Sequence, residues 1–297
     1  MHIVPRIPIT GEMITSTNVT DAADFDLSTT YNLGDLVTDP ATMIEYESQG
    51  AGNLGNTPAT DDGTWWVATG YANSMRMVDG FLSAQTTNAN SIELVLDIGQ
   101  LFTSVVCFNV SAQEVTLSIK EDAAEIFSQT IDMVRTDDVQ DLWDYFFTEP
   151  EYKTVAIFPS VPGFAGAQAT LTISAPSDTA KIGEAFFGYG RFIGETLEGS
   201  GPQFKDYSVK EANDYGEFTV VERPFSRGAS FEVGINPQDT ERIMRILEEN
   251  RAKVCAFFPA DEMEHYGLTI AGFLTKFSPG LKHRGIVPVN INVEGVT

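Results

Sequence analysis

Three glycines, Gly50, Gly52 and Gly55, match the G-x-G-x-x-G spacing of a dinucleotide-binding loop. Such a loop needs a strand before it and a helix that opens at its end, because the helix N-terminus holds the pyrophosphate. The residues that follow, NTPATDDGTWW, are successive turn formers without an apolar helical face. A second glycine set in residues 188–194, GYGRFIG, has the wrong spacing and lies in a strand-like run. The sequence therefore predicts neither a dinucleotide site nor any other cofactor.

Residues for metal or nucleophilic chemistry are few and scattered. The three histidines, His2, His265 and His283, form no H-E-x-x-H or paired-histidine pattern, and no G-x-S-x-G elbow occurs. Cys107 and Cys255 both sit inside apolar runs. This favours two buried structural thiols over a disulfide or a nucleophile, and no metal site is predicted.

The segment DDVQDLWDYFFTEPEY is both acidic and aromatic, and it is the place where a glycosidase carboxylate pair could lie. Its candidate carboxylates are Asp137, Asp138, Asp141, Asp144 and Glu149. In a chain with 42 Asp and Glu residues, chance clusters of carboxylates are expected, so a solvated acidic loop is favoured. We predict that the protein is not an enzyme and keep a glycan depolymerase as the second alternative.

The net charge narrows the range of partners. Lys and Arg number 18 against 42 Asp and Glu, a formal charge of −24. Nucleic acid and anionic membrane surfaces would be repelled by this field. No run reaches the roughly 18 apolar residues of a membrane helix, and the start MHIVPRIPIT lacks the features of a signal peptide. We expect synthesis in a cytoplasm, no nucleic-acid partner and no membrane insertion.

Four aromatic residues, Tyr31, Tyr46, Trp65 and Trp66, frame a segment rich in glycine and turn residues. Flat, rigid aromatic faces suit the C–H faces of sugar rings. The segment resembles the small β module of the chitin- and cellulose-binding class. The resemblance rests on the run YNLGDLV, followed by a Tyr-containing strand, a loop with Asn and Pro, and a closing Trp. The resemblance, over residues 28–68, implies a glycan-binding surface made by these four rings. The alternative is that the same rings form the core of the module.

Period-two alternation dominates the rest of the chain and predicts strands buried on one side. The alternating apolar positions are Ile92, Leu94, Leu96 and Ile98; Val115, Leu117 and Ile119; Leu171 and Ile173; and Val287, Val289, Ile291 and Val293. The fold class predicted is mainly β. A small N-terminal β unit, a central antiparallel β-sandwich and a C-terminal α+β unit are expected over residues 1–80, 81–195 and 196–297.

One segment, NPQDTERIMRILEENRAK, is predicted to be helical. Asn236 is a suitable N-cap, Pro237 suits the first helical position, and Asp239 adds favourable charge in the first turn. The apolar face is expected to contain Ile243, Met244, Ile246 and Leu247, with Glu241 and Arg245 as an i,i+4 pair. This helix should pack on a sheet and carry no chemistry.

The order of segments over residues 20–297 resembles a family of bacteriophage tail proteins. The segments are GYANSMRMVDG after the aromatic module, then the alternating strands, then DYSVKEANDYGEFTVVERPFSRGASFEV, and VNINVEGVT at the end. In that family a carbohydrate-module-like segment precedes a β-sandwich, and an S-x-K-E…V-x-E-R segment leads into a terminal α+β unit. The terminal unit is similar to tail-tube and distal-tail domains, which form rings by joining sheets edge to edge.

The resemblance implies a structural component of the tail tip or baseplate, located in the virion, that links the tube to the hub or fibres. It also implies a homo-oligomer, a trimer or hexamer, that contacts other tail proteins. Exposed strand edges need a partner, and closure into a ring supplies one. The first alternative is a receptor-recognition protein that binds a host-surface glycan.

A cation-containing segment, YSVKEANDYGEFTVVERPFSR, is the predicted subunit interface. Arg suits bidentate interface pairing better than Lys, so Arg223 is expected to pair with a carboxylate of a neighbouring subunit. A solvated hairpin is the alternative. The candidate interface residues are Tyr207, Lys210, Glu211, Glu222, Arg223 and Arg227.

Overall fold

The predicted fold class is confirmed by a computed structural model, which is mainly β with antiparallel sheets. The structure describes residues 1–122, 124–135, 141–147, 151–212, 216, 218–223, 225–260, 267–279 and 285–296. The chain divides into two compact units, which are described separately. The first unit is Met1–Ile7, Phe102–Val106 and Phe186–Thr297, and the second is Pro8–Leu101 and Cys107–Ala185.

The second unit is built around a five-stranded antiparallel sheet of order β2-β6-β11-β8-β9. Its strands are β2 (Ile14–Thr17), β6 (Thr86–Asp97), β8 (Glu114–Glu121), β9 (Ala124–Asp132) and β11 (Gln168–Ile182). The register places Leu171 between Leu94 and Leu117. All of the alternating apolar residues predicted for these strands are buried, so one face of the sheet forms core.

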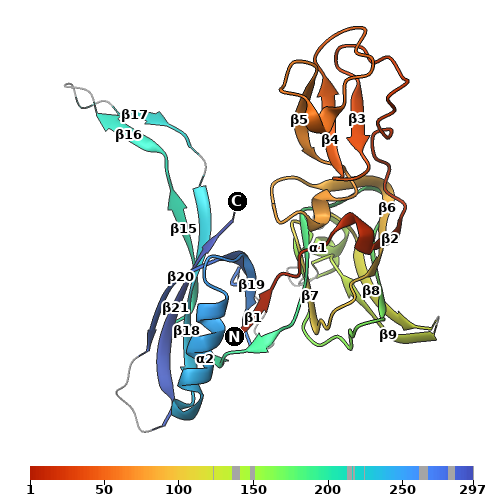
Figure 1. Ribbon diagram of the computed structural model, residues 1–297. Helices are drawn as coiled ribbons and strands as arrows, with labels where there is room; N and C mark the ends of the chain where they lie inside the picture. The colour runs from red at the N-terminus through yellow and green to blue at the C-terminus, as the bar shows by residue number, and fades with distance from the viewer. Residues whose placement is uncertain are drawn as a thin grey trace. The chain divides into compact units, whose positions relative to one another are not determined.

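A small antiparallel sheet of order β3-β4-β5 belongs to the same unit. Its strands are β3 (Leu36–Asp39), β4 (Ile44–Ser48) and β5 (Trp66–Tyr71). We call residues 25–71 the aromatic module (Figure 1). Short elements complete the unit: 3-10 turns at Gly11–Met13, Pro58–Thr60 and Arg76–Val78, and helix α1 (Leu142–Phe147).

A three-stranded sheet of order β10-β7-β12 contains the points where the chain passes from one unit to the other. Its strands are β10 (Val155–Phe158), β7 (Ser104–Phe108) and β12 (Glu184–Gly188). Every residue of β7 and β12 is buried.

The first unit has an eight-stranded sheet of order β13-β1-β19-β20-β21-β18-β14, in which β15 also pairs with β18. The strands are β1 (His2–Pro5), β13 (Arg191–Phe192), β14 (Glu195–Thr196), β15 (Gly201–Asp206), β18 (Phe225–Ile235), β19 (Cys255–Phe258), β20 (Ile270–Pro279) and β21 (Val287–Gly295). The predicted inward residues of β21, Val287 to Val293, are buried and share a core with Phe231 and Val233 of β18.

The predicted helix is present as a 3-10 turn at Pro237–Asp239 followed by α2 (Thr240–Glu249). Its inward face is Ile243, Ile246 and Leu247, an i, i+3, i+4 set packed in the same core. Met244 is 39% exposed, because it projects from the neighbouring side of the helix. The Asn236 side chain makes no capping hydrogen bond, whereas the ion pair of Glu241 with Arg245 is present at 3.7 Å.

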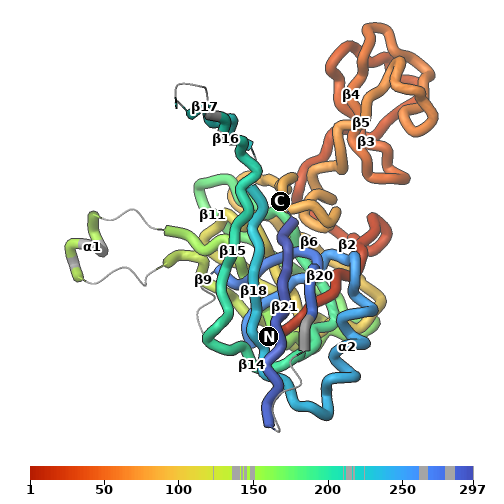
Figure 2. The backbone as a smooth tube through the Cα atoms, turned by 90° about the vertical axis from the view of Figure 1, so that its left-hand side faces the viewer, coloured from red at the N-terminus to blue at the C-terminus, as the bar shows by residue number. Residues whose placement is uncertain are grey.

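A hairpin of β16 (Val209–Ala212) and β17 (Phe218–Val221) runs on beyond β15 (Figures 1 and 2). Together with β15 and the first half of β18 it forms what we call the ribbon, the described part of residues 201–230. The pairing of β18 with β21 begins at Gly228, so in the described residues Phe225 to Arg227 pair only with β15.

Candidate functional site

Tyr31 and Trp66, two of the four residues predicted to form either a glycan-binding surface or the module core, are core residues of the aromatic module. Tyr31 is 8% and Trp66 2% exposed, and their rings meet edge to face at 5.1 Å. Phe25 packs against both rings at 5.9 Å and 5.8 Å. The Trp66 indole N–H donates to the Asn56 carbonyl at 2.8 Å, and the Tyr31 hydroxyl accepts the Asp26 N–H at 2.8 Å. These two rings hold the module together, and neither offers a face to a ligand.

Tyr46 and Trp65 are half-buried and pack against this cluster from its edge. The Trp65 ring lies directly over Gly50, where a Cβ atom would come within 3.1 Å of the ring. Gly52 and Gly55 have φ of +76° and +78°, a backbone conformation that side chains disfavour. The glycine spacing therefore shapes a loop that lets an indole lie against the backbone.

A single carboxylate organises the loop that presents both tryptophans. Asp61 Oδ2 accepts the backbone N–H groups of Gly63 at 2.9 Å, Trp65 at 3.0 Å and Trp66 at 2.9 Å. These hydrogen bonds, that of Trp66 first, lower the pKa of Asp61 below its ordinary value. The loop depends on Asp61 being ionised.

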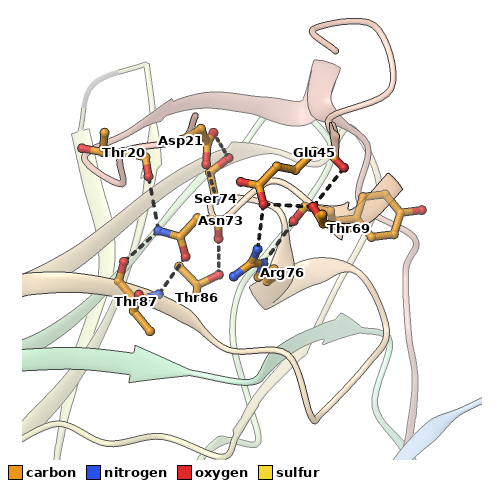
Figure 3. A network of polar contacts seen from close by, with 10 residues as sticks. Thr20, Asp21, Glu45, Thr69, Asn73, Ser74, Arg76, Thr86 and Thr87 are labelled. Carbon is orange, nitrogen blue, oxygen red and sulfur yellow. Dashed lines mark hydrogen bonds and ion pairs between the residues drawn. The ribbon is translucent and has the colours of Figure 1, made fainter. Parts of the chain in front are cut away.

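The segment that enters the aromatic module, at Thr20 and Asp21, is hydrogen-bonded to the segment that leaves it, at Asn73 and Ser74 (Figure 3). Asp21 accepts the Ser74 backbone N–H at 2.7 Å and the Ser74 hydroxyl at 2.6 Å. Asn73 donates to the carbonyls of Thr20 at 3.3 Å and Thr87 at 2.8 Å and accepts the Thr87 N–H at 3.0 Å. These hydrogen bonds tie the exit segment to both the entry segment and β6.

A second cluster beside this junction fixes the end of β5 (Figure 3). Arg76 lies 3.5 Å from the Glu45 carboxylate and donates to the Tyr71 carbonyl at 3.0 Å. The Thr69 hydroxyl donates to Glu45 Oε1 at 3.0 Å. Glu45 is 9% exposed, so its charge is satisfied by this pair and this hydroxyl within the described structure.

The ribbon is the other place where aromatic side chains gather, and here they are exposed. In the register of β15 with β18, Phe204 lies opposite Arg227 and Asp206 opposite Phe225. Phe204 and Phe225 therefore share the face that, further along β18, carries the buried Ala229 and Phe231. Phe204 is 77% and Phe225 50% exposed. The core face of the sheet continues into the ribbon without a cover.

The hairpin β16–β17 is similarly apolar and open to solvent. Phe218 and Val220 of β17 lie on one face and are 75% and 57% exposed, while Val221 on the other face is 51% exposed. An isolated two-stranded hairpin is at best marginally stable in water. In the described residues, β16 and β17 pair with each other and with no third strand.

The predicted interface residues lie along this ribbon. Glu211, Glu222, Arg223 and Arg227 are exposed, and the Arg223 N–H donates to the Ser208 hydroxyl at 3.1 Å. The backbone of Lys210 pairs with Val220, and its side chain lies outside the described residues.

Tyr207 anchors the root of the ribbon. Its hydroxyl donates to Glu294 Oε1 at 3.2 Å, and the Lys205 ammonium lies 4.9 Å from the centre of its ring. The sequence analysis missed the three exposed phenylalanines, Phe204, Phe218 and Phe225. The sequence feature that could have identified them is that they are large apolar residues inside a segment rich in charged residues.

The carboxylates proposed for a depolymerase can be described only in part. Asp137, Asp138 and Glu149 lie outside the described residues, as does the side chain of Asp144. Asp141 Oδ1 accepts the Trp143 N–H at 2.8 Å, an Asx turn that begins α1.

Both cysteines were predicted to be buried structural thiols. Cys107 and Cys255 are free and buried, and burial raises the pKa of each thiol to about 12. A thiol with such a pKa is almost entirely protonated near neutral pH, and a protonated thiol is a poor nucleophile.

His2 is the described histidine, and His265 and His283 lie outside the described residues. The His2 ring stacks on Phe258 at 5.0 Å, and burial lowers its pKa. Among the described side chains, no group of three or more His, Cys, Asp or Glu is placed to hold a metal ion. Within the same ranges, no helix combines the length and apolar character needed to cross a bilayer.

Comparison with known proteins returned little. No protein-family model and no curated protein matches the sequence. One similar structure is chitosan-binding module 1 of a chitosanase/glucanase from Paenibacillus sp. IK-5, with 12% identity and a TM-score of 0.27 over 39% of this chain and 83% of that module. Another is the fucose-binding module SpX-3 of Streptococcus pneumoniae, with 13% identity and a TM-score of 0.26 over 38% of this chain and 82% of that module. Both are carbohydrate-binding modules, and at these TM-scores the function has to be argued from this chain's own residues.

Proposed function

We propose that this protein is a non-enzymatic structural subunit of a bacteriophage tail tip or baseplate, and that it assembles with further copies of itself through the ribbon. The observation that carries the proposal is the exposure of three phenylalanines along the ribbon: Phe204 and Phe225 share one face of β15 and β18, and Phe218 lies on the adjoining hairpin. Contiguous exposed apolar surface marks interaction sites. Burying one such side chain contributes about 1.5–3 kcal/mol, so a covering partner would stabilise a ribbon that is marginal alone.

The charge distribution supports a second copy as that partner. Four of the chain's 18 Lys and Arg residues lie between residues 201 and 228, and the whole chain carries −24. The same span holds five Asp and Glu residues, so it is nearly neutral, and two copies would repel each other less there than over the rest of this acidic chain. The tail-tip location in the virion, the links to tube, hub or fibres, and a trimeric or hexameric order rest on the resemblance of the ordered sequence segments.

The test is the mass of the purified full chain in solution. We expect sedimentation velocity to detect an oligomer for the natural sequence and a monomer for the variant Phe204→Ser/Phe218→Ser/Phe225→Ser. The matched control replaces three exposed leucines of the aromatic module, Leu33, Leu36 and Leu54, by Ser; these are 67%, 46% and 55% exposed. This control should assemble like the natural chain. A natural chain that stays monomeric at every concentration would overturn the proposal.

Glycan binding is a second candidate, because Tyr46 and Trp65 are incompletely buried at one edge of the module. Titration with chitin and cellulose oligosaccharides should then change Trp fluorescence in the natural chain and not in Trp65→Ala. Trp143→Ala, which removes an exposed indole outside the module, is the control. Unchanged fluorescence at millimolar sugar in the natural chain would remove this candidate.

A further inference from the structure

An apolar socket of about 260 Å³ opens at the root of the ribbon, in the same unit. Leu197, Pro202, Pro259 and Leu268 form most of its lining, and Glu198 supplies a carboxylate. Pockets for drug-sized ligands measure about 300–1,000 Å³. This socket is smaller and suits one or two apolar side chains.

Hydrogen bonds hold the walls of the socket in place. The Leu197 N–H donates to the Glu232 carbonyl at 2.7 Å, and the Glu232 N–H donates to the Ser200 hydroxyl at 2.9 Å. On the opposite wall the Ala260 N–H donates to the Thr196 hydroxyl at 3.1 Å. The socket is therefore formed before anything enters it.

A side chain that could fill such a socket, Phe204, lies two residues after the lining residue Pro202 on β15. Pro202 and Phe204 of β15 point to one face because side chains alternate along a strand. Phe204 is 77% exposed, so its ring does not fill the socket of its own chain. Arg227 stands directly opposite Phe204 on β18, which places an aromatic ring and a guanidinium side by side.

The charges beside the socket and beside Phe204 are of opposite sign: Glu198 is acidic and Arg227 is basic. Across the described part of the chain, no ion pair involves Glu198 or Arg227. The pair of Arg227 and Phe204 is complementary to the pair of Glu198 and the apolar socket, since Arg is well suited to ion pairs at interfaces.

We propose that the socket receives Phe204 of a second copy, and that Arg227 of that copy pairs with Glu198. This inference rests on the proposed self-assembly and specifies its contact. Each copy carries both the projection and the socket, so it can donate Phe204 to one neighbour and accept Phe204 from another.

Cysteine cross-linking tests the contact between chains. Two full-length populations are mixed, one with Phe204→Cys and the other with Leu197→Cys, so that a bond between the new cysteines must join two chains. Cys107 and Cys255 are buried and do not compete. We expect a mixed disulfide between the two populations under mild oxidation. Replacing Phe204→Cys by Gln203→Cys, on the opposite face of β15, should abolish it.

A charge exchange provides the second measurement. Glu198→Arg and Arg227→Glu should each weaken self-association several-fold, and the double variant should restore it; Phe204→Ala should weaken it roughly thirtyfold or more. Oligomers that form normally, without the mixed disulfide and without an effect of Glu198→Arg, would overturn the socket contact and leave the assembly proposal standing. A monomeric natural chain would overturn both.

Discussion

The aromatic module and the ribbon use the same residue types in opposite ways. In the module, Tyr31 and Trp66 are 8% and 2% exposed and bind each other edge to face. In the ribbon, Phe204 and Phe218 are 77% and 75% exposed. Both regions are small β structures with few strands, so strand number does not account for the difference.

The difference lies in what closes each region. The module folds a loop back over its sheet, and Asp61 holds that loop through three backbone N–H groups. The ribbon has no such loop in its described residues, and its phenylalanines Phe204 and Phe218 remain exposed. Aromatic residues in a small β unit therefore do not indicate a binding surface until the element that would cover them is known.

Trp66→Ala should give the largest effect. Removing a buried aromatic side chain costs about 3–5 kcal/mol, because the neighbouring Tyr31 and Phe25 rings cannot fill the cavity. Urea unfolding followed by near-ultraviolet circular dichroism should show the module unfolding at lower denaturant.

Phe218→Ala is the matched test in the ribbon. It should change the stability of the monomer by no more than about 0.5 kcal/mol, since the ring is solvated before and after the change. Equal losses of stability for the two variants would contradict the contrast between a module whose aromatic rings are buried and a ribbon whose rings are exposed.

Asn73→Ala tests how firmly the module is held at its base. The change leaves the Thr87 N–H and the carbonyls of Thr20 and Thr87 without the side chain that satisfies them. A loss of about 1 kcal/mol is expected, because three hydrogen bonds are removed but water can partly satisfy the exposed groups that remain. Hydrogen exchange should quicken at residues 72–75 and 86–88. Unchanged exchange there would mean that Asn73 is dispensable.

The acid stability of the module should depend on Asp61. Hydrogen bonds from the backbone N–H groups of Trp66, and then of Trp65 and Gly63, lower its folded-state pKa. The ionised form is therefore favoured in the folded state, and its contribution is fully present above the unfolded pKa of about 3.9. The contribution is lost as pH falls through the lower, folded-state pKa.

Trp fluorescence measured from pH 6 to pH 2 checks this dependence. Asp61→Asn should be less stable than the natural chain at pH 6, and the gap should narrow below pH 4. Asp62→Asn, which leaves the hydrogen bonds of Asp61 intact, should follow the natural chain. If the difference in stability between the natural chain and Asp61→Asn stayed constant with pH, the effect of Asp61 would not come from its charge.

Local periodicity predicted much of the fold. Alternation located the buried faces of β6, β8, β11 and β21, and the 3.6-residue period located Ile243, Ile246 and Leu247 on α2. The same reasoning placed Met244 in that face, yet it is 39% exposed. Neighbouring helix residues differ by about 100° in direction, and a short apolar pattern does not define the edge of the buried face to within one residue.

The sites were harder to predict because burial depends on distant partners. Whether Tyr31 and Trp66 face solvent depends on Phe25 and on a loop closed by Asp61. The exposure of Phe204 follows from the register of β15 with β18, which joins residues about twenty positions apart and which no local pattern encodes. After Gly55 the chain forms a 3-10 turn at Pro58–Thr60 and then β5, so the helix that a nucleotide loop requires does not begin there.

Tyr207→Phe should give the smallest effect and tests the root of the ribbon. The change removes the hydroxyl that donates to Glu294 and keeps the ring beneath Lys205. A loss below about 1 kcal/mol is expected, because a single hydrogen bond at a 42% exposed residue competes with water. Thermal unfolding of the monomer should therefore shift little, while hydrogen exchange in β15 becomes faster. A loss of stability larger than that of Asn73→Ala would contradict the contrast between module and ribbon. The ribbon would then be held by contacts within its own chain as firmly as the module is.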